Sequence, residues 1–583
     1  MTQASHEYDA FVADFHAHMT RDPNECVMLG VASRLDELPD PGLDAQADEV
    51  AGARALVDRA RKLGQNPGKT ADPGPGQNGL DFDARLDLDL ATLMLEARIH
   101  RATYTFNDRT MRQQMPTASD DISRGIFAMF INDPRPDGER LASITARLEA
   151  VPAFLDGMIR RLDTPVARWV DIELAQLAGL PEFFTSLQDW ADKADWPDAV
   201  RLDRARLRAN EALFHYAELL RAMPVTRQFH AGDQIARRIV ALAGIEQSLS
   251  DLHAMATRFL ADTRQIIDRL RNRLCEKYQL AADTTNDELQ QFLDQRYPAV
   301  PPGGALELIL DRYRAERDKL RIFVAEHGLF PVPDQQDMKI LRTPAFMEAS
   351  IPAGAMEPPP PFRPGTRTSL VYLTLSEELR AEHTELSIPN MMIHEGIPGH
   401  HLQLATASLH PSVVRRHVNA NEHAEGWTTM LEDYMLDIGY MGELTDEARF
   451  VAKRDISRIG ARVAIDLFFM TGERDYLDVG VPCDLSSADP FAAAGHLLRE
   501  VTGFVPQRVQ AELNWYSRER GYPLSYLTGN RLVWQLKRDV AEAQRGKLEG
   551  HDLDRMFHTI YLESGNMPLS FLRRVFEHRG LLA

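Results

Sequence analysis

Helical periodicity dominates this sequence and limits the folds that it can adopt. From residue 80 to about residue 320, apolar positions recur at helical spacing nearly throughout. The segments at residues 205–223 and 235–274 are long, with charged and apolar side chains in helical register and few prolines or glycines. Such segments usually pack side by side as bundle helices. We therefore expect a mainly α-helical chain whose long helices enclose a cleft, with a small β-sheet near the active site.

The clearest strand candidate lies at residues 368–375, which read T-S-L-V-Y-L-T-L. This segment alternates and is rich in β-forming side chains. It could form the edge of a sheet, where an extended peptide would bind through its backbone. It could equally belong to a small sheet that does not contact substrate, and the sequence leaves both alternatives open.

Proline-rich stretches divide the rest of the chain. We expect amphipathic helices at residues 8–19 and 45–63, and a loop at residues 66–79, where prolines and glycines interrupt every element. Residues 352–366 include four consecutive prolines and indicate an extended connector. The predicted organisation is a helical N-terminal part (1–351), this connector (352–366) and a catalytic part (367–583), which could together form one continuous structural unit.

Composition excludes some classes of partner. The formal net charge of −20 argues against nucleic-acid binding by the surface as a whole. The first residues lack the basic and apolar regions of a secretory signal, and no apolar run reaches the length of a membrane span. Cys26, Cys275 and Cys483 are far apart, which fits a reducing compartment. We therefore expect a cytoplasmic protein that binds neither nucleic acid nor membrane, and the sequence does not indicate its oligomeric state.

The densest group of chemically active side chains lies at residues 387–403, S-I-P-N-M-M-I-H-E-G-I-P-G-H-H-L-Q. His394 and Glu395 begin the signature H-E-x-x-H, in which two histidines one helical turn apart bind zinc and the glutamate is the general base. Pro398 occupies the place of the second histidine, and proline cannot ligate a metal. Proline also removes a helical hydrogen bond, and Gly399 tolerates unusual backbone conformations. The sequence therefore predicts a widened or bulged turn here.

Two histidines after this turn could replace the missing ligand. A two-residue insertion would return His400 to the side of the helix that carries His394. His401 shares a face with His394 on a regular helix, but seven residues separate the two by about 10 Å along the axis. Zinc ligands lie about 2 Å from the metal, so this separation is too large. We favour His400, with His401 as the alternative.

A zinc site of this type needs a third protein ligand. The helical segment at residues 421–435 carries four acids, which are Glu422, Glu425, Glu432 and Asp433. Glu425 follows Glu395 after enough residues for one helix, a loop and a returning helix. Glu422 lies one turn earlier, and spacing alone does not exclude it.

Four motifs of the C-terminal part together resemble the bacterial DUF885 family, which is grouped with the gluzincin-like zinc metallopeptidases. They are H-E-G-I-P-G-H-H-L-Q, A-E-G-W, Y-P-L-S-Y-L-T-G and F-H-T-I-Y-L-E-S-G-N-M-P-L. The resemblance implies a zinc-peptidase-like architecture and one Zn²⁺ per chain. It places the third ligand at the Glu of E-G-W, Glu425, and matches family positions at Tyr526 and Gly529. One departure is Asp466-Leu467-Phe468-Phe469-Met470, where the family pattern D-x-G-x-H has a glycine and a histidine.

These observations predict a zinc-dependent hydrolase, a metallopeptidase that acts on short peptides. Zinc would be held by His394, His400 and Glu425, and Glu395 would be the general base. Tyr526 would donate a hydrogen bond to the oxyanion, unless it is a core tyrosine. His401 and His558 could orient other groups or be structural. The alternatives are a hydrolase of non-peptide amides and a binding protein that has lost turnover, the latter suggested by the departure after Asp466.

Overall fold

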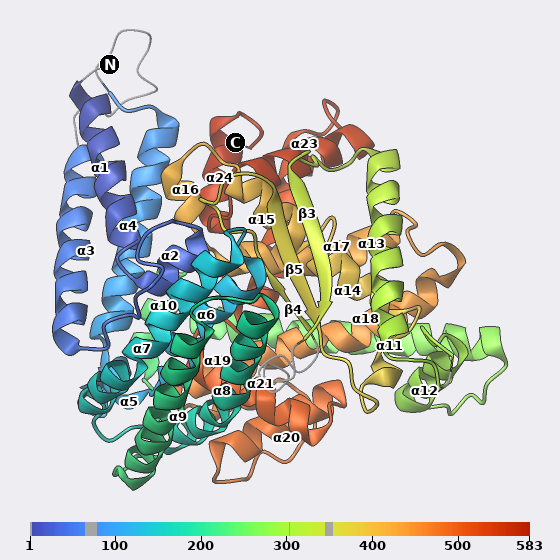
Figure 1. Cartoon of the computed structure of the whole chain (residues 1–583). Helices are drawn as coiled ribbons and strands as arrows, with labels where there is room; N and C mark the ends of the chain where they lie inside the picture. Colours follow the sequence, from blue (N-terminus) through green and yellow to red (C-terminus); the bar gives the residue numbers. More distant parts are fainter. Residues whose placement is uncertain (1–2, 65–78, 302, 344–353, 583) are drawn as a thin grey trace.

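A computed structural model of the chain describes residues 3–64, 79–301, 303–343 and 354–582 (Figure 1). Helix makes up 68% of the chain and strand 5%, which confirms the expected mainly α class. The loop expected at residues 66–79 lies almost entirely outside the described residues.

The N-terminal part is built from helices and one short hairpin. Its helices are α1 (Gln3–Met19), α2 (Pro23–Leu29), α3 (Leu43–Gly64), α4 (Phe82–Thr103), α5 (Met111–Gln114), α6 (Ala118–Asn132), α7 (Asp137–Arg161), α8 (Ala167–Lys193), α9 (Ala199–Ala222), α10 (Asp233–Leu242), α11 (Leu249–Tyr278), α12 (Asn286–Arg296) and α13 (Glu307–His327). The hairpin strands are β1 (Thr105–Phe106) and β2 (Arg109–Thr110).

After a sheet formed by β3 (Gln336–Arg342), β4 (Gly354–Glu357) and β5 (Arg367–Leu373), the chain is helical again. These helices are α14 (Ser387–Glu395), α15 (His400–Ser408), α16 (Val413–His417), α17 (Asn421–Asp437), α18 (Thr445–Ile456), α19 (Arg458–Thr471), α20 (Pro490–Thr502), α21 (Pro506–Arg518), α22 (Ser525–Ala543), α23 (Gly550–Glu563) and α24 (Leu569–His578).

The helical segment expected at residues 235–274 is divided into α10 and α11. Gly244 lies between them with φ of 79°, a conformation that L-residues with side chains rarely adopt. Ser248 then starts α11 with a capping box, because its hydroxyl accepts from the Asp251 N–H at 3.1 Å and the Asp251 carboxylate accepts from the Ser248 N–H at 3.3 Å. Local turn chemistry thus overrides a helical period that continues through the break.

The three-stranded sheet has the order β3-β5-β4. β3 runs parallel to β5, with Gln336 opposite Arg367, and β4 runs antiparallel to it, with Gly354 opposite Leu373. The strand expected at residues 368–375 therefore exists and is central, which excludes the sheet edge, one of the two alternatives that the sequence left open. Its two neighbours occupy both hydrogen-bonding edges, and residues 369–373 are buried, as in a strand covered on both faces. The edges belong to β3 and β4.

The largest apolar core joins distant parts of the chain. It packs residues of α1, α3 and α4 together with residues of α14, α17 and α22–α24. In Figure 1 the sheet crosses the middle of the molecule, between the blue helices α1, α3 and α4 and the green helix α13. Strand β4 lies within the segment expected to be a connector, and β3 lies before it. The division at residues 352–366 stays a prediction, and a core shared across it fits the single-unit alternative.

Candidate metal centre

The motif that begins with His394 and Glu395 forms two helices with a tight turn between them. α14 ends at Glu395 and α15 begins at His400, so the helix is interrupted here and not merely widened as expected. The turn contains a cis peptide bond between Ile397 and Pro398. A side chain on Gly399 would place its Cβ 2.0 Å from the carbonyl oxygen of His394, so only glycine fits at this position. The close turn brings His400 back beside His394.

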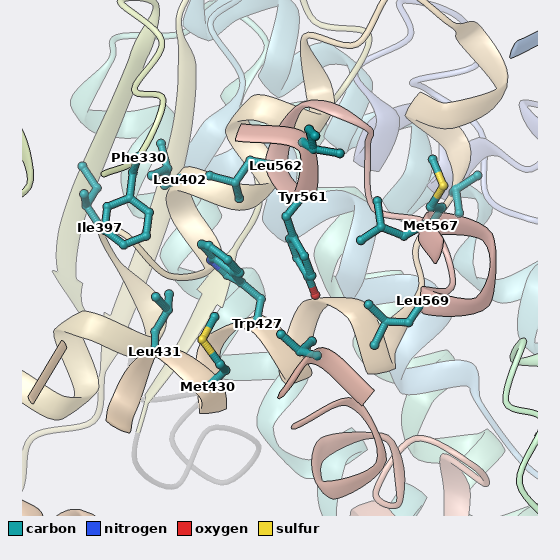
Figure 2. Packing of buried hydrophobic residues seen from close by; sticks show 14 of the residues in the cluster. Phe330, Ile397, Leu402, Trp427, Met430, Leu431, Tyr561, Leu562, Met567 and Leu569 are labelled. Carbon is teal, nitrogen blue, oxygen red and sulfur yellow. The ribbon is translucent and has the colours of Figure 1, made fainter. Parts of the chain in front are cut away.

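Trp427, an aromatic residue of α17, packs against this turn and supports it. The indole N–H of Trp427 donates to the carbonyl oxygen of Pro398 at 2.9 Å. Trp427 is fully buried and stacks on Tyr561, with ring centroids 4.7 Å apart. Figure 2 shows the two rings side by side, with Ile397 and Leu402 on the other side of the indole. The hydrophobic core therefore holds the turn in place.

His394, His400 and Glu425 are brought together at this turn. One ligand atom from each lies within 4.8 Å of the others, and all three residues are buried. Glu425 Oε2 lies 3.3 Å from His400 Nε2 and 3.6 Å from His394 Nε2. In a tetrahedral zinc site with bonds of about 2.0–2.2 Å, neighbouring ligand atoms are about 3.3–3.6 Å apart. The donor set and its spacing therefore fit a zinc ion.

Two buried polar atoms of this cluster have no hydrogen-bond partner among the described residues. They are Glu425 Oε2 and His400 Nδ1. A buried carboxylate oxygen without a donor is costly, and such atoms in native structures call for an explanation. A cation between Glu425 Oε2 and the two histidines would satisfy the oxygen.

The electrostatics of the cluster also favour a positive charge. Burial alone would lower the pKa of His394, but Glu425 and Glu432 outweigh burial and raise it. Burial would raise the pKa of Glu425, but His400 and His394 outweigh burial and hold it well below its usual range. Glu425 is therefore an anion at neutral pH, as a metal ligand must be.

Glu432 is a part of the site whose role the sequence did not reveal. Its Oε1 lies 2.8 Å from His394 Nδ1. Because Nδ1 donates to this carboxylate, Nε2 of the neutral ring carries the lone pair, and it lies 3.6 Å from Glu425 Oε2 and 3.4 Å from Thr428 Oγ1. Glu432 follows Glu425 by seven residues, which places both acids on one face of α17. This spacing was the available signal.

Tyr522 is the second part that sequence reasoning missed, although it lies in the motif Y-P-L-S-Y-L-T-G. Its hydroxyl donates to Glu425 Oε1 at 2.8 Å, so both oxygens of Glu425 face the site. The predicted Tyr526 lies beside Tyr522, with ring centroids 5.8 Å apart. Burial and the charge of Glu425 raise the pKa of Tyr526, which therefore keeps its proton. Two phenols thus adjoin the cluster.

The sequence matches the model of the family described as "Bacterial protein of unknown function (DUF885)" over residues 23–576. The chain belongs to the DUF885 family. No curated protein matches it. Two solved structures share its fold, one from Shewanella oneidensis called "a putative lipoprotein of unknown function" and one from Colwellia psychrerythraea called "the putative lipoprotein". The first has 18% identity and a TM-score of 0.74, and covers 99% of this chain and 100% of its own. The second has 14% identity and a TM-score of 0.75, and covers 98% and 99%.

These likenesses establish the fold of the DUF885 chain and not its activity. Among the described residues, no helix is both long enough and apolar enough to span a membrane. The cytoplasmic location stays a prediction.

The alternative ligands of the DUF885 chain lie outside the cluster. His401 faces the sheet, where its Nδ1 lies 2.8 Å from Ser369 Oγ and its Nε2 lies 2.5 Å from Gln336 Oε1. Glu422 accepts from the backbone N–H of Leu569 at 3.1 Å. Each therefore has a structural partner elsewhere. The roles of His400 and Glu425 as zinc ligands stay predictions, now with a geometry that suits them.

Glu395 lies next to the cluster and is half-buried. Its charge raises the pKa of both His394 and Tyr526, so the Glu395 carboxylate lies near both residues. His558, in contrast, stacks on Phe330 with ring centroids 4.6 Å apart, and its Nδ1 lies 3.1 Å from the carbonyl oxygen of Leu329. Its contacts are those of a core residue.

The departure after Asp466 also has a clear place in the structure. The Asp466 carboxylate accepts from the backbone N–H groups of Gly521, at 3.1 Å, and Leu524, at 3.1 Å. It therefore holds the turn that carries Tyr522. Met470 is fully buried, and its carbonyl oxygen accepts from the backbone of residues 231 and 232. Position 470 of this chain is thus part of an apolar core.

Proposed function

We propose that this DUF885 chain is a zinc-dependent hydrolase of short peptides, with one Zn²⁺ held by His394, His400 and Glu425. The observation that supports it most is the buried cluster, in which the spacing of three ligand atoms suits tetrahedral zinc and one carboxylate oxygen has no hydrogen bond. When bound, zinc would polarise the substrate carbonyl and make water more acidic.

The residues around the cluster suit the remaining steps of amide hydrolysis. Glu395 would accept a proton from the attacking water and deliver it to the leaving amine, since it is half-buried beside His394. Tyr526 would donate a hydrogen bond to the oxyanion, because its raised pKa keeps the phenol protonated. Tyr522 and Glu432 would orient Glu425 and His394, with which they form hydrogen bonds.

The decisive experiment measures zinc content and hydrolysis on the same preparation. Wild-type protein loaded with zinc is incubated with a mixed pool of short peptides, alongside the Glu395→Gln variant. Glutamine keeps the size of the side chain but cannot accept the proton, so zinc should be retained while turnover falls by about 10²–10⁴. Glu378→Gln is the matched control, because Glu378 is exposed and lies outside the cluster.

Three results would contradict the proposal in different ways. Loss of zinc from Glu395→Gln would make Glu395 a ligand. Full turnover by this variant would place the general base elsewhere. If zinc-loaded wild type cleaves no peptide, a non-peptide amide hydrolase or a binding protein with the same fold would be the better description.

A further inference from the structure

Two arginines of α19 lie near the aromatic side chains that adjoin the metal centre. Arg458 and Arg462 are one helical turn apart on α19. The guanidinium carbon of Arg462 lies 4.3 Å from the centroid of the Tyr526 ring. Tyr526 in turn adjoins Tyr522, whose hydroxyl holds Glu425. A series of three contacts therefore connects Glu425, the candidate ligand, with the buried guanidinium of Arg462. They are one hydrogen bond and two ring contacts, none longer than 5.8 Å.

Arg462 is held rigidly but keeps a free donor group. Its Nε donates to the Tyr516 hydroxyl at 2.9 Å, and its Nη2 donates to Glu512 Oε2 at 2.8 Å. Tyr516 also donates to Glu512 at 2.5 Å, so Arg462, Tyr516 and Glu512 are each hydrogen-bonded to the other two. Its Nη1 meets no acceptor in the part of the chain that the structure describes. A fixed guanidinium with an unused edge is preorganised to bind an anion.

Arg458 has more unused donors. Its Nη1 donates to Asp455, while its Nε and Nη2 have no acceptor within residues 3–64, 79–301, 303–343 and 354–582. Its side chain is 12% exposed, against 7% for Arg462. The two acids Asp455 and Glu512 already balance the two guanidinium charges. The pair therefore suits a small anion of single charge better than a phosphate dianion.

A half-buried aromatic wall stands between the arginines and the metal centre. It consists of Trp515, Tyr522 and Tyr526. The Trp515 ring lies 5.0 Å from that of Tyr522, and the Arg462 guanidinium lies 5.3 Å from the Trp515 ring. An apolar or aromatic side chain would pack well on this wall while a neighbouring carboxylate reached the arginines.

We propose that Arg458 and Arg462 bind a carboxylate of the substrate, and that Trp515, Tyr522 and Tyr526 receive the side chain next to it. The inference rests on the proposed function and specifies its substrate class as short peptides that present a free carboxylate on this side of the cleaved bond. An extended peptide spans about 3.3–3.6 Å per residue, so a few residues cover the path from Glu425 to Arg462. The carboxylate can belong to the chain terminus or to an acidic side chain.

Binding to zinc-loaded Glu395→Gln protein, in which turnover is strongly reduced, tests the inference. Calorimetry compares three peptides of equal length, of which one ends in a free carboxylate, one in a carboxamide, and one in aspartate with a carboxamide terminus. Bonds to charged groups contribute about 1.5–3 kcal/mol, so a carboxylate peptide should bind at least about tenfold more tightly than the neutral peptide. The peptide that shows the higher affinity tells whether the site binds a terminal carboxylate or an acidic side chain.

The added Arg458→Gln substitution should abolish this gain while leaving the neutral peptide bound as before. Arg454→Gln is the matched control, since Arg454 lies one turn earlier and pairs with Asp287 on α12. Circular dichroism and zinc content check that each variant is folded.

Equal affinity for all three peptides, or a gain that survives Arg458→Gln, would overturn the inference. Failure of the carboxylate-subsite proposal can be distinguished from failure of the proposed hydrolase function. A wild-type protein that cleaves carboxamide and carboxylate peptides with equal kcat/KM is a hydrolase without this subsite. A protein that cleaves nothing but still distinguishes the peptides has the subsite without the activity.

Discussion

Replacing Glu432 with glutamine should weaken zinc binding although Glu432 is not one of the three predicted ligands. The carboxylate lies 2.8 Å from His394 Nδ1 and determines which nitrogen of His394 faces the cluster. The glutamine oxygen can still accept from Nδ1, so the orientation of the ring should survive. The substitution removes only the negative charge of the carboxylate next to His394 Nδ1.

The size of the effect follows from the difference between two kinds of hydrogen bond. A bond to a charged group contributes about 1.5–3 kcal/mol and a neutral one about 0.5–1.5 kcal/mol. The difference of about 1–1.5 kcal/mol corresponds to a roughly five- to tenfold weaker affinity. This lies at or just below the lower limit of the 10–100-fold losses that are typical when such supporting groups are removed, because glutamine keeps the hydrogen bond.

Competition with a chromogenic chelator of known zinc affinity measures the change. Glu422→Gln is the control, because Glu422 is a buried acid on the same helix that bonds to Leu569 and not to the cluster. Burial raises the pKa of Glu422 to about 7, so glutamine resembles its protonated form. Its zinc affinity should equal that of the wild type. An unchanged affinity of Glu432→Gln, or an equal loss in both variants, would refute the role of Glu432.

Two further variants test the scaffold. Gly529→Ala should lower the free energy of unfolding by at least about 1–3 kcal/mol in urea titrations. The reason is that the new Cβ would lie 1.9 Å from the Glu422 carbonyl oxygen, where α17 and α22 cross. A variant as stable as the wild type would contradict this contact. Burial and Lys537 lower the pKa of His558 to about 3, below the value of about 6.5 for an unfolded chain, so its contribution to stability is complete above pH 6.5 and is lost as the pH falls toward 3. The stability difference between wild type and His558→Asn should therefore shrink by roughly 1 kcal/mol per pH unit below about pH 6, and a constant difference would mean that His558 is not neutral in the fold.

Local patterns were enough to predict the class of fold and to select the residues that meet at the centre. His394 was recognisable because Glu395 follows it. His400 could be preferred over His401 because Pro398 and Gly399 forbid a regular helix. The type of interruption was not predictable, since a bulged helix and a break satisfy the same residues. The difference lies in the packing of Trp427 against the turn, which is a contact across 29 positions of the sequence.

Apart from Glu432, whose spacing from Glu425 was a local signal, the parts that sequence reasoning missed depend on contacts between distant segments. β3 alternates only weakly, with buried Met338 and Ile340 between polar residues, and it becomes a strand because β5 pairs with it. Tyr522 reaches Glu425 from 97 positions away. Its placement depends on Asp466, which holds the turn before it. Contacts of this kind have no local signature, so only the assembled fold reveals them.

Buried charge alone does not mark a functional site in this chain, as the ion pair of Asp87 and Arg415 shows. Asp87 is buried and accepts from Arg415 at 2.8 Å, from Tyr8 at 2.9 Å and from Ser412 at 2.6 Å. Both carboxylate oxygens of Asp87 are therefore hydrogen-bonded, and the pair joins α4 to α16. Glu425 is as deeply buried, yet one of its oxygens has no donor among the described residues. Leaving a buried carboxylate oxygen unpaired costs stability, and a cation held jointly with His394 and His400 would offset that cost. This contrast within one molecule favours a cation at Glu425 and not at Asp87.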